Sequence, residues 1–387
     1  MPVARGDAVA LTRALVRIDS RNPLLVPGAP GEARVARELA GVLEAWGFRV
    51  EIIDAAPGRP SVVARIGKSG GRSLMFNGHL DVVGVEGMTH DPWSAESNGH
   101  EGRMYGRGSA DMKGGVAAMC AAAARVSDSL DGEIVIAAVA DEEYESIGTR
   151  SVIDHGIRAD AAIVTEPTQL AIMPAHLGFV WLDVTTHGRA AHGSRWDLGI
   201  DAIRHAGLFL AELDRLDSED LPRRSHPLLG RPSVHASLIE GGTGMSTYPD
   251  KCVIRIERRT IPGESRADVV RELEAACDRI RGRAANFRGD VVETFAQPPS
   301  DVATDAPIVR ALETALADSN EKTHIAGMTA WTDAALLNDA GIPAICFGPG
   351  DIRLAHAAEE WVPVTEIERA TTVLARLATS WCARKTS

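Results

Sequence analysis

The pattern of hydrophobic and polar positions divides the chain into stretches of two kinds. In the first 165 residues, amphipathic helical stretches such as residues 31–46 alternate with short apolar runs. Two of those runs, Glu133–Ala140 and Ala161–Thr165, are almost entirely apolar, which is typical of strands that are covered on both faces. Because helices alternate with such strands, this part of the sequence predicts an α/β fold with a mostly parallel sheet flanked by helices.

From residue 179 to residue 296 the pattern is different. Stretches that alternate apolar and polar residues, as half-exposed antiparallel strands do, are interleaved with two helical stretches. In chain order these are Phe179–Gly188, Ile200–Leu216, Ser233–Glu240, Lys251–Arg259, Ser265–Arg281 and Val291–Phe295. The order β-α-β-β-α-β predicts a ferredoxin-like α+β domain. After Pro299 the α/β pattern returns, so we expect one α/β domain, residues 1–178 and 297–387, interrupted by an inserted domain, residues 179–296.

Composition and charge exclude several classes of protein. The 387 residues are 45% hydrophobic, which is enough for a sizeable core and excludes a largely disordered chain. The net charge of −12 argues against a nucleic-acid or anionic-membrane partner, and no apolar run approaches the roughly 20 residues of a membrane span. Five scattered cysteines without a CxxC pair, and an N-terminal segment without the apolar core of a signal peptide, predict a reduced cytoplasmic protein.

Polar side chains follow the predicted strands at the ends where open α/β sheets bind ligands. They are His79 and Asp81 after residues 73–76, Asp111 in a glycine-rich loop, Glu142 and Glu143 after residue 140, Glu166 after residue 165, and His356 after a Gly-Pro-Gly turn. Each also has an ordinary structural explanation. Asp111 could cap the following helix, the acidic triplet at 141–143 could be a solvated turn, and His356 could be an exposed loop histidine.

Together, His79, Asp111, Glu143, Glu166 and His356 form a mixed set of nitrogen and oxygen donors. Such a set suits zinc, cobalt or manganese, and it is too large for one catalytic zinc with an open position. It fits two divalent ions about 3.5–4 Å apart that share a bridging carboxylate. A neighbouring acid can then serve as general base, and a carboxylate two residues from a histidine ligand can fix the tautomer of that histidine.

This ordered set of motifs resembles the dinuclear-zinc metallopeptidase and amidohydrolase family of acetylornithine deacetylase, succinyl-diaminopimelate desuccinylase, aminoacylase and carboxypeptidase G. The resemblance covers nearly the whole chain, including the inserted domain, which it identifies as a lid and dimerisation domain. It implies that Asp111 bridges two zinc ions. His79 and Glu166 would complete one metal site, and Glu143 and His356 would complete the other.

The same resemblance implies further site residues. Glu142 would be the general base, and Asp81 would orient His79. In the inserted domain, the sequence Gly-Arg-Ala-Ala-His that ends at His192 matches a histidine that polarises the scissile carbonyl, often from the partner subunit of a homodimer. Arg259 matches an arginine that binds the carboxylate of the substrate. Other substrate contacts would come from Ser246, Trp196, Thr332 and Gly350.

We therefore expect an enzyme that hydrolyses the amide bond of N-acyl amino acids, with acetyl as the leading acyl group, by means of a metal-bridging hydroxide. The alternatives are a dipeptidase or carboxypeptidase with the same metal centre, a succinyl-diaminopimelate desuccinylase, and an inactive ligand-binding relative. The presence of Glu142 and of every expected ligand disfavours an inactive relative. Ser246 and Trp196 replace an asparagine and a proline that are common in the family, and these departures leave the substrate open.

Overall fold

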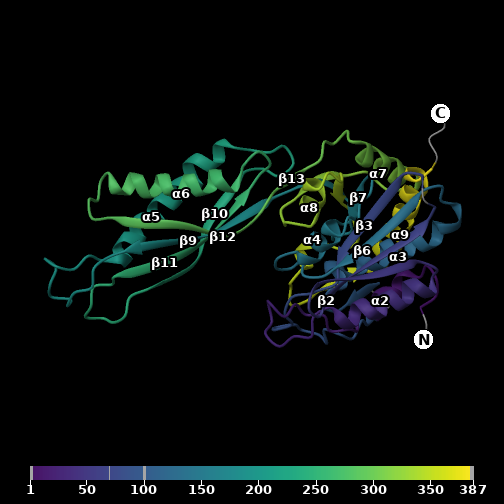
Figure 1. Ribbon diagram of the computed structural model, residues 1–387, viewed down its shortest axis with the longest axis horizontal. Helices are drawn as coiled ribbons and strands as arrows, with labels where there is room; N and C mark the ends of the chain where they lie inside the picture. Colours follow the sequence, from purple (N-terminus) through teal and green to yellow (C-terminus); the bar gives the residue numbers. More distant parts are fainter. Residues whose placement is uncertain (1–2, 69, 99–101, 384–387) are drawn as a thin grey trace. The chain divides into compact units, whose positions relative to one another are not determined.

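The computed structural model describes residues 3–68, 70–98 and 102–383, and it divides the chain into two compact units (Figure 1). The main unit comprises residues 1–174, 302–326 and 332–387. The inserted unit comprises residues 175–301 together with the short segment 327–331. The main unit is therefore assembled from segments that precede and follow the inserted unit in the sequence.

A sheet that is nine-stranded over the described residues runs through the main unit in the order β1-β2-β6-β3-β7-β15-β8-β13, with β14 paired to β8. Its strands are β1 (Arg49–Ala56), β2 (Arg59–Gly67), β3 (Ser73–His79), β6 (Glu133–Val139), β7 (Ala162–Val164), β8 (Ile172–His176), β13 (Ser300–Asp301), β14 (Ile325–Met328) and β15 (Ala344–Cys346). The central strands β6, β3, β7 and β15 are parallel, whereas β1, β2, β8 and β13 pair antiparallel with their neighbours. The mostly parallel sheet predicted from the sequence is confirmed at its centre.

Helices flank this sheet, as predicted. They are α1 (Ala8–Val16), α2 (Ala33–Ala45), α3 (Gly114–Val126), α4 (Ile147–Asp154), α7 (Pro307–Asp318), α8 (Ala334–Asp339) and α9 (Val364–Trp381). Every residue of β6 from Ile134 to Val139 is buried, so this strand is covered on both faces and its apolar run is explained. In α3, residues 114–124 are all buried, because glycine and alanine let the helix lie close to the sheet. None of the helices in the described ranges has the length and apolar character needed to cross a membrane.

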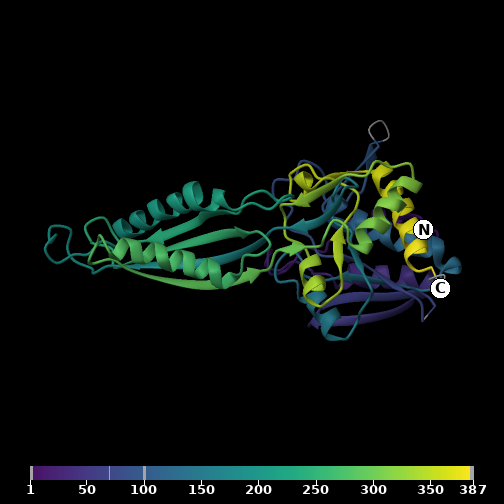
Figure 2. The same ribbon diagram turned by 90° about the horizontal axis from the view of Figure 1, so that it is seen from above.

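The inserted unit has the predicted ferredoxin-like arrangement. Its antiparallel sheet has the strand order β10-β11-β9-β12, and α5 and α6 lie side by side over one face of it (Figure 2). The elements are β9 (Gly178–His187), α5 (Ala202–Arg215), β10 (Ser233–Gly241), β11 (Lys251–Thr260), α6 (Arg266–Arg281) and β12 (Arg288–Gln297). Ser265 and Asp268 form a capping box that fixes the start of α6. Leu182, Phe209 and Ile254 belong to the core between helices and sheet.

A short antiparallel sheet in the order β16-β5-β4 joins two loops of the main unit. Its strands are β4 (Ser97–Asn98), β5 (Arg103–Tyr105) and β16 (Trp361–Pro363). Strand β5 leads into the glycine-rich loop before Asp111, and β16 follows the loop that contains His356. The pairing of β5 with β16 therefore brings these two candidate ligand loops together.

Candidate metal centre

The predicted metal ligands all lie in the main unit, in the loops at the carboxyl ends of its parallel strands. His79 ends β3, Glu143 follows β6, Glu166 follows β7, His356 follows β15, and Asp111 lies in the turn before α3. The side chains of His79, Asp111, Glu143 and Glu166 are buried or nearly so, whereas that of His356 is half exposed. The parallel topology thus gathers at one edge of the sheet residues that are far apart in the sequence.

Asp111 lies between the two histidines. Its Oδ1 is 3.1 Å from Nε2 of His79, and its Oδ2 is 3.6 Å from Nε2 of His356. Nε2 of His356 is also 3.0 Å from Oε2 of Glu143. Because each oxygen of Asp111 faces a different histidine, the carboxylate has the geometry that a bridging ligand requires.

Two sets of three side chains each bring their donor atoms within 4.8 Å of one another. One set is His79, Glu142 and Glu166, and the other is His79, Asp111 and Glu143. The five expected ligands and Glu142 therefore form one continuous cluster. Both sets share His79, and Glu142 lies in a position from which its carboxylate reaches the same space as the ligands.

The electrostatics of this cluster fit divalent cations. Burial raises the pKa of Glu142 and Glu166 well above the ordinary value. The negative charge of Glu166 adds to this effect at Glu142, and that of Asp111 adds to it at Glu166. Burial also raises the pKa of Glu143, with a further contribution from Asp111. For Asp111 the effect of burial is outweighed by the hydrogen bond from His79, which lowers its pKa. Buried carboxylates at this density are costly unless a cation compensates them, so the donor set fits metal ions.

The contacts of Asp81 differ from the predicted ones, in which its carboxylate orients His79. Nδ1–H of His79 donates to the main-chain carbonyl of Asp81 at 2.9 Å, whereas the nearest carboxylate oxygen of Asp81 is 3.7 Å from Nδ1. The carboxylate accepts hydrogen bonds from the backbone amides of Glu142 and Glu143, at 3.1 and 3.3 Å. Asp81 therefore fixes the His79 ring through its backbone and holds the acidic loop through its side chain.

A buried network behind Asp81 was not predicted from the sequence. Nδ2 of Asn22 donates to Asp81 at 2.8 Å and to Asp141 at 2.9 Å. Arg59 forms a bidentate ion pair with Glu32, both contacts at 2.6 Å, and also contacts Asp141 at 2.9 Å. No local motif marks these residues, because they come from distant segments and become neighbours only in the folded sheet.

Glu360 fixes the turn that carries Asp111. Its Oε1 accepts hydrogen bonds from the backbone amides of Ala110 and Asp111, at 3.0 and 3.1 Å, and its Oε2 pairs with Arg107 at 2.7 Å. Burial raises the pKa of Glu360 to about 7. The only sequence signal for this role was its position next to Glu359 shortly after His356.

Asp333 supports the same site from the other side of the acidic loop. Its Oδ2 accepts a hydrogen bond from Thr149 at 2.6 Å, and Thr149 in turn accepts one from Asn77 at 3.1 Å. Burial raises the pKa of Asp333 to about 6. The neighbouring Thr332, a predicted substrate contact, is buried with its hydroxyl 3.3 Å from Sγ of Cys346.

The other predicted substrate contacts lie in separate places. Gly350 is in the main unit, where its amide donates to Glu366 at 2.8 Å. His192, Ser246 and Trp196 lie in two neighbouring loops of the inserted unit, where the amide of Gly193 donates to the carbonyl of Ser246 at 2.7 Å. Trp196 is 81% exposed, so it packs little against its own unit.

Arg259 lies on the face of the inserted sheet that α5 and α6 do not cover. It pairs with Glu257 at 2.6 Å, and its guanidinium lies 5.3 Å from the centre of the Phe179 ring. Nε1 of Trp181 donates to Glu257 at 2.9 Å. These contacts hold the guanidinium of Arg259 in a partly exposed position beside an aromatic surface.

A family model described as Peptidase family M20/M25/M40 matches residues 75–380. The chain belongs to this family. Its M20 relatives include acetylornithine deacetylase of Myxococcus xanthus, 32% identical over 351 residues that cover 88% of this chain and 90% of the relative. Another is N-formyl-4-amino-5-aminomethyl-2-methylpyrimidine deformylase of Bacillus subtilis, 28% identical over 396 residues that cover 93% of this chain and 92% of the relative.

Solved M20 structures share the fold of this chain. A metallo-carboxypeptidase from Sulfolobus solfataricus has a TM-score of 0.80 at 16% identity, with 97% of this chain and 99% of that chain covered. A dinuclear metal-binding peptidase from Bacillus subtilis has a TM-score of 0.73 at 16% identity, with 96% and 97% covered. The family expected from the sequence is confirmed, and this M20 protein is an enzyme that hydrolyses amide bonds in a metal-dependent reaction.

Proposed function

We propose that this M20 enzyme removes an acyl group, with acetyl as the first candidate, from amino acids that keep a free carboxylate. The observation that carries the proposal is the largely buried cluster of two histidines and four carboxylates, in which each oxygen of Asp111 faces a different histidine. The similarity to the acetylornithine deacetylase of Myxococcus xanthus favours acetyl among the possible acyl groups.

The chain's own residues divide the chemistry between them. Two divalent ions, held by the five predicted ligands, would supply a Lewis acid and a water that is nucleophilic at neutral pH. Glu142 takes a proton from the attacking water and returns it to the leaving nitrogen, and the burial that raises the pKa of this carboxyl suits both transfers. His192 donates to the oxygen of the scissile carbonyl, and Arg259 binds the carboxylate of the substrate through a bidentate pair.

We further propose that His192 acts on the substrate of a partner subunit in a homodimer. Arg259 is paired with Phe179 near the start of β9, whereas the loop of His192 begins beyond His187, at the other end of that strand. The strand from Phe179 to His187 is about 26 Å long at ~3.3 Å per residue. That distance exceeds the length of an N-acyl amino acid, so one inserted unit cannot offer both groups to one substrate, but two copies can.

We propose zinc as the metal and the cytoplasm as the compartment. Imidazole and carboxylate donors without a thiolate suit zinc, and they also suit cobalt or manganese. The five cysteines are all buried and unpaired, which supports a reducing compartment.

Amine release from a panel of substrates tests the proposed reaction. The panel contains N-acetyl-ornithine and other N-acetyl amino acids, N-succinyl-diaminopimelate and unblocked dipeptides, each with zinc-loaded enzyme and a chelated control. We expect metal-dependent cleavage of N-acetyl amino acids. Cleavage of dipeptides alone would place the enzyme among peptidases, and equal rates after chelation would contradict the metal mechanism.

The role of Arg259 is tested by Arg259→Ala. Loss of the guanidinium removes a bidentate ion pair with the substrate, so KM should rise about tenfold or more for substrates with a free α-carboxylate. The KM for substrates whose α-carboxylate is esterified should change little. Arg255→Ala, which removes a half-exposed arginine from the same face of β11, is the matched control. An unchanged KM in Arg259→Ala would assign the carboxylate to another residue.

A further inference from the structure

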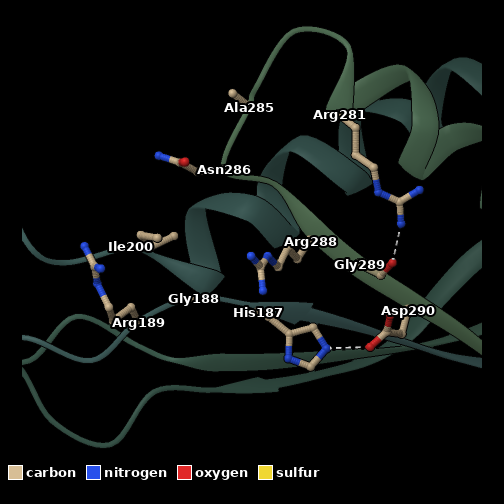
Figure 3. Close-up of a pocket in the computed structure, with 10 residues that line it drawn as sticks. All are labelled: His187, Gly188, Arg189, Ile200, Arg281, Ala285, Asn286, Arg288, Gly289 and Asp290. Carbon is tan, nitrogen blue, oxygen red and sulfur yellow. Dashed lines mark hydrogen bonds and ion pairs between the residues drawn. The ribbon is translucent and has the colours of Figure 1, made fainter.

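The inserted unit contains a cavity of about 750 Å³ whose ten lining residues have no role in the chemistry above (Figure 3). The end of β9, the start of β12 and the segment that joins α6 to β12 form its walls. Strand pairing places His187 opposite Arg288 across the floor of the cavity. The volume lies within the range of about 300–1,000 Å³ that is usual for small-molecule sites.

Some of the charges around this cavity are already paired. Nε2 of His187 lies 2.7 Å from the carboxylate of Asp290, the one acidic residue of the lining. Arg281 forms an ion pair with Asp278 and donates to the carbonyl of Gly289 at 2.8 Å. Because of these pairs, His187 and Arg281 contribute little net charge to the cavity.

Two other arginines keep donors free for a ligand. The backbone of Arg288 pairs with β9, but its guanidinium has no hydrogen-bond or ion-pair partner among the residues that the structure describes. Arg189 uses Nε to donate to the carbonyl of Leu198, which leaves the terminal nitrogens of its guanidinium available. Figure 3 shows Arg288 between Arg189 and Arg281 along the cavity. A concentration of unpaired positive charge is unexpected in a chain with a net charge of −12, so it calls for a local explanation.

The walls of the cavity are held in place by close backbone packing. A Cβ atom added to Gly188 would lie 2.2 Å from the carbonyl oxygen of Ile200, and one added to Gly289 would lie 3.0 Å from the ring of Phe287. The backbone segments that carry Arg189 and Arg288 therefore have little room to shift. A cavity that is formed before its ligand arrives loses less binding energy to ordering than a mobile surface does.

We propose that this cavity binds a small molecule through a phosphate or carboxylate group, at a site separate from the metal centre. A guanidinium presents paired N–H donors that match the oxygens of either group, and Arg189 and Arg288 supply two of them. Ile200 and Ala285 add an apolar patch for the remainder of the ligand. The proposal does not depend on the substrate assigned to the metal centre.

Calorimetric titration of the zinc-loaded enzyme with inorganic phosphate, and separately with citrate, tests this site at constant ionic strength. We expect saturable binding of at least one of these anions, with one site per chain, that persists when the metal is removed by chelation. Arg288→Gln and Arg189→Gln should each raise the Kd about tenfold or more. Arg266→Gln, at the other end of α6, is the matched control and should bind like the wild type.

The two anions distinguish the chemistry of the natural ligand. Tighter binding of phosphate supports a phosphorylated ligand, and tighter binding of citrate supports a polycarboxylate. Absence of saturable binding to the wild type would overturn the proposal. So would a Kd that is equal in Arg288→Gln, Arg189→Gln and the wild type, or binding that disappears entirely on chelation, since the anion would then be held by the metal ions.

Discussion

The position of Asp111 between the two histidines is fixed by residues that are not themselves predicted metal ligands. Glu360 holds the backbone amides of residues 110 and 111, and Arg107 holds Glu360. On the other side of the site, Asp81 holds the amides of Glu142 and Glu143. The backbones of Asp111, Glu142 and Glu143 are thus each fixed by a second buried carboxylate, which limits the motion of this part of the site before any ion or substrate binds.

Glu142→Gln tests the assignment of the general base. The amide keeps the shape of the side chain but cannot accept a proton, so kcat should fall by about 10²–10⁴-fold while two metal ions per chain are retained. Metal content by elemental analysis and kcat on the same sample provide the measurement. Glu145→Gln, an exposed acid of the same loop, should leave both values unchanged. Loss of metal in Glu142→Gln would instead make Glu142 a ligand.

His176 makes folding sensitive to acid. Burial lowers the pKa of His176 from 6.5 to about 4. Nδ1–H donates to the carbonyl of Leu177 at 3.0 Å, and Nε2 has no partner within the described ranges. As the pH falls below about 6.5, the unfolded chain takes up a proton that the folded chain resists until about pH 4, so stability is lost across this window. The loss should reach about 3 kcal/mol.

Replacement of the imidazole ring of His176 by a ring that takes up no proton isolates the contribution of this residue to the pH dependence of stability. In His176→Phe, the free energy of unfolding measured with urea between pH 7 and pH 4 should fall by about 3 kcal/mol less than in the wild type. His155→Gln alters an exposed histidine and should keep the wild-type pH dependence. A pH dependence that is identical in His176→Phe and the wild type would contradict the assignment.

At the scale of elements, the site forms where four parallel strands end. Helix α3 must lie very close to the segment that follows one of these strands, β7. A Cβ atom added to Gly115 in α3 would lie 2.0 Å from the carbonyl oxygen of Thr165, the residue before Glu166. The backbone at Gly115 and the backbone at Thr165 cannot move apart without displacing Glu166, a predicted metal ligand. Gly115 is therefore a steric requirement of the metal centre as well as of the packing of the helix.

Gly115→Ala should lower the free energy of unfolding by about 1–3 kcal/mol and should also weaken metal binding, because the shift displaces Glu166. Urea unfolding and a competition assay for zinc give the two values. Gly207→Ala in α5 makes the same chemical change where no atom lies within 4 Å of the new Cβ, and it should leave stability equal or higher. Equal effects of the two substitutions would contradict the steric argument.

The elements were more predictable than the contacts between them. The apolar run 133–140 predicted β6, and the alternating patterns of the inserted segment predicted its four strands, because burial follows local periodicity. The same logic placed the candidate ligands at strand ends. Asn22 and Arg59 could not be predicted, because their partners come from distant segments. The left-handed backbone conformation of His356, with φ of 60°, could not be predicted either, because a histidine does not by itself indicate this conformation.

At the scale of the whole molecule, the exposed edge of β10 indicates how two copies would associate. Leu238 and Ile239 are 58% and 55% exposed on this edge strand. Unpaired backbone groups and apolar side chains on one edge form a surface that a second β10 can pair with and cover. The homodimer proposed above would use this edge.

Ile239→Lys should weaken that dimer at least tenfold, because a charge would be buried at the new interface. Sedimentation equilibrium measures the change, and the specific activity at low protein concentration should fall with it, since His192 would lose its partner active site. Val292→Lys, at an equally exposed position on the opposite edge strand β12, should not alter association. A wild-type protein that is monomeric at micromolar concentration would contradict the proposal.

The order of segments in the main unit has a consequence during synthesis on the ribosome. Strand β15 pairs with β7 across a gap in the sequence that contains the entire inserted unit. His356 and Glu360 follow β15. Until these residues emerge, β7 has an open edge, and the nascent chain holds only part of the ligand set. The complete donor set therefore forms only after the inserted unit has been translated, and we expect a metal that needs all of these ligands to bind after that point.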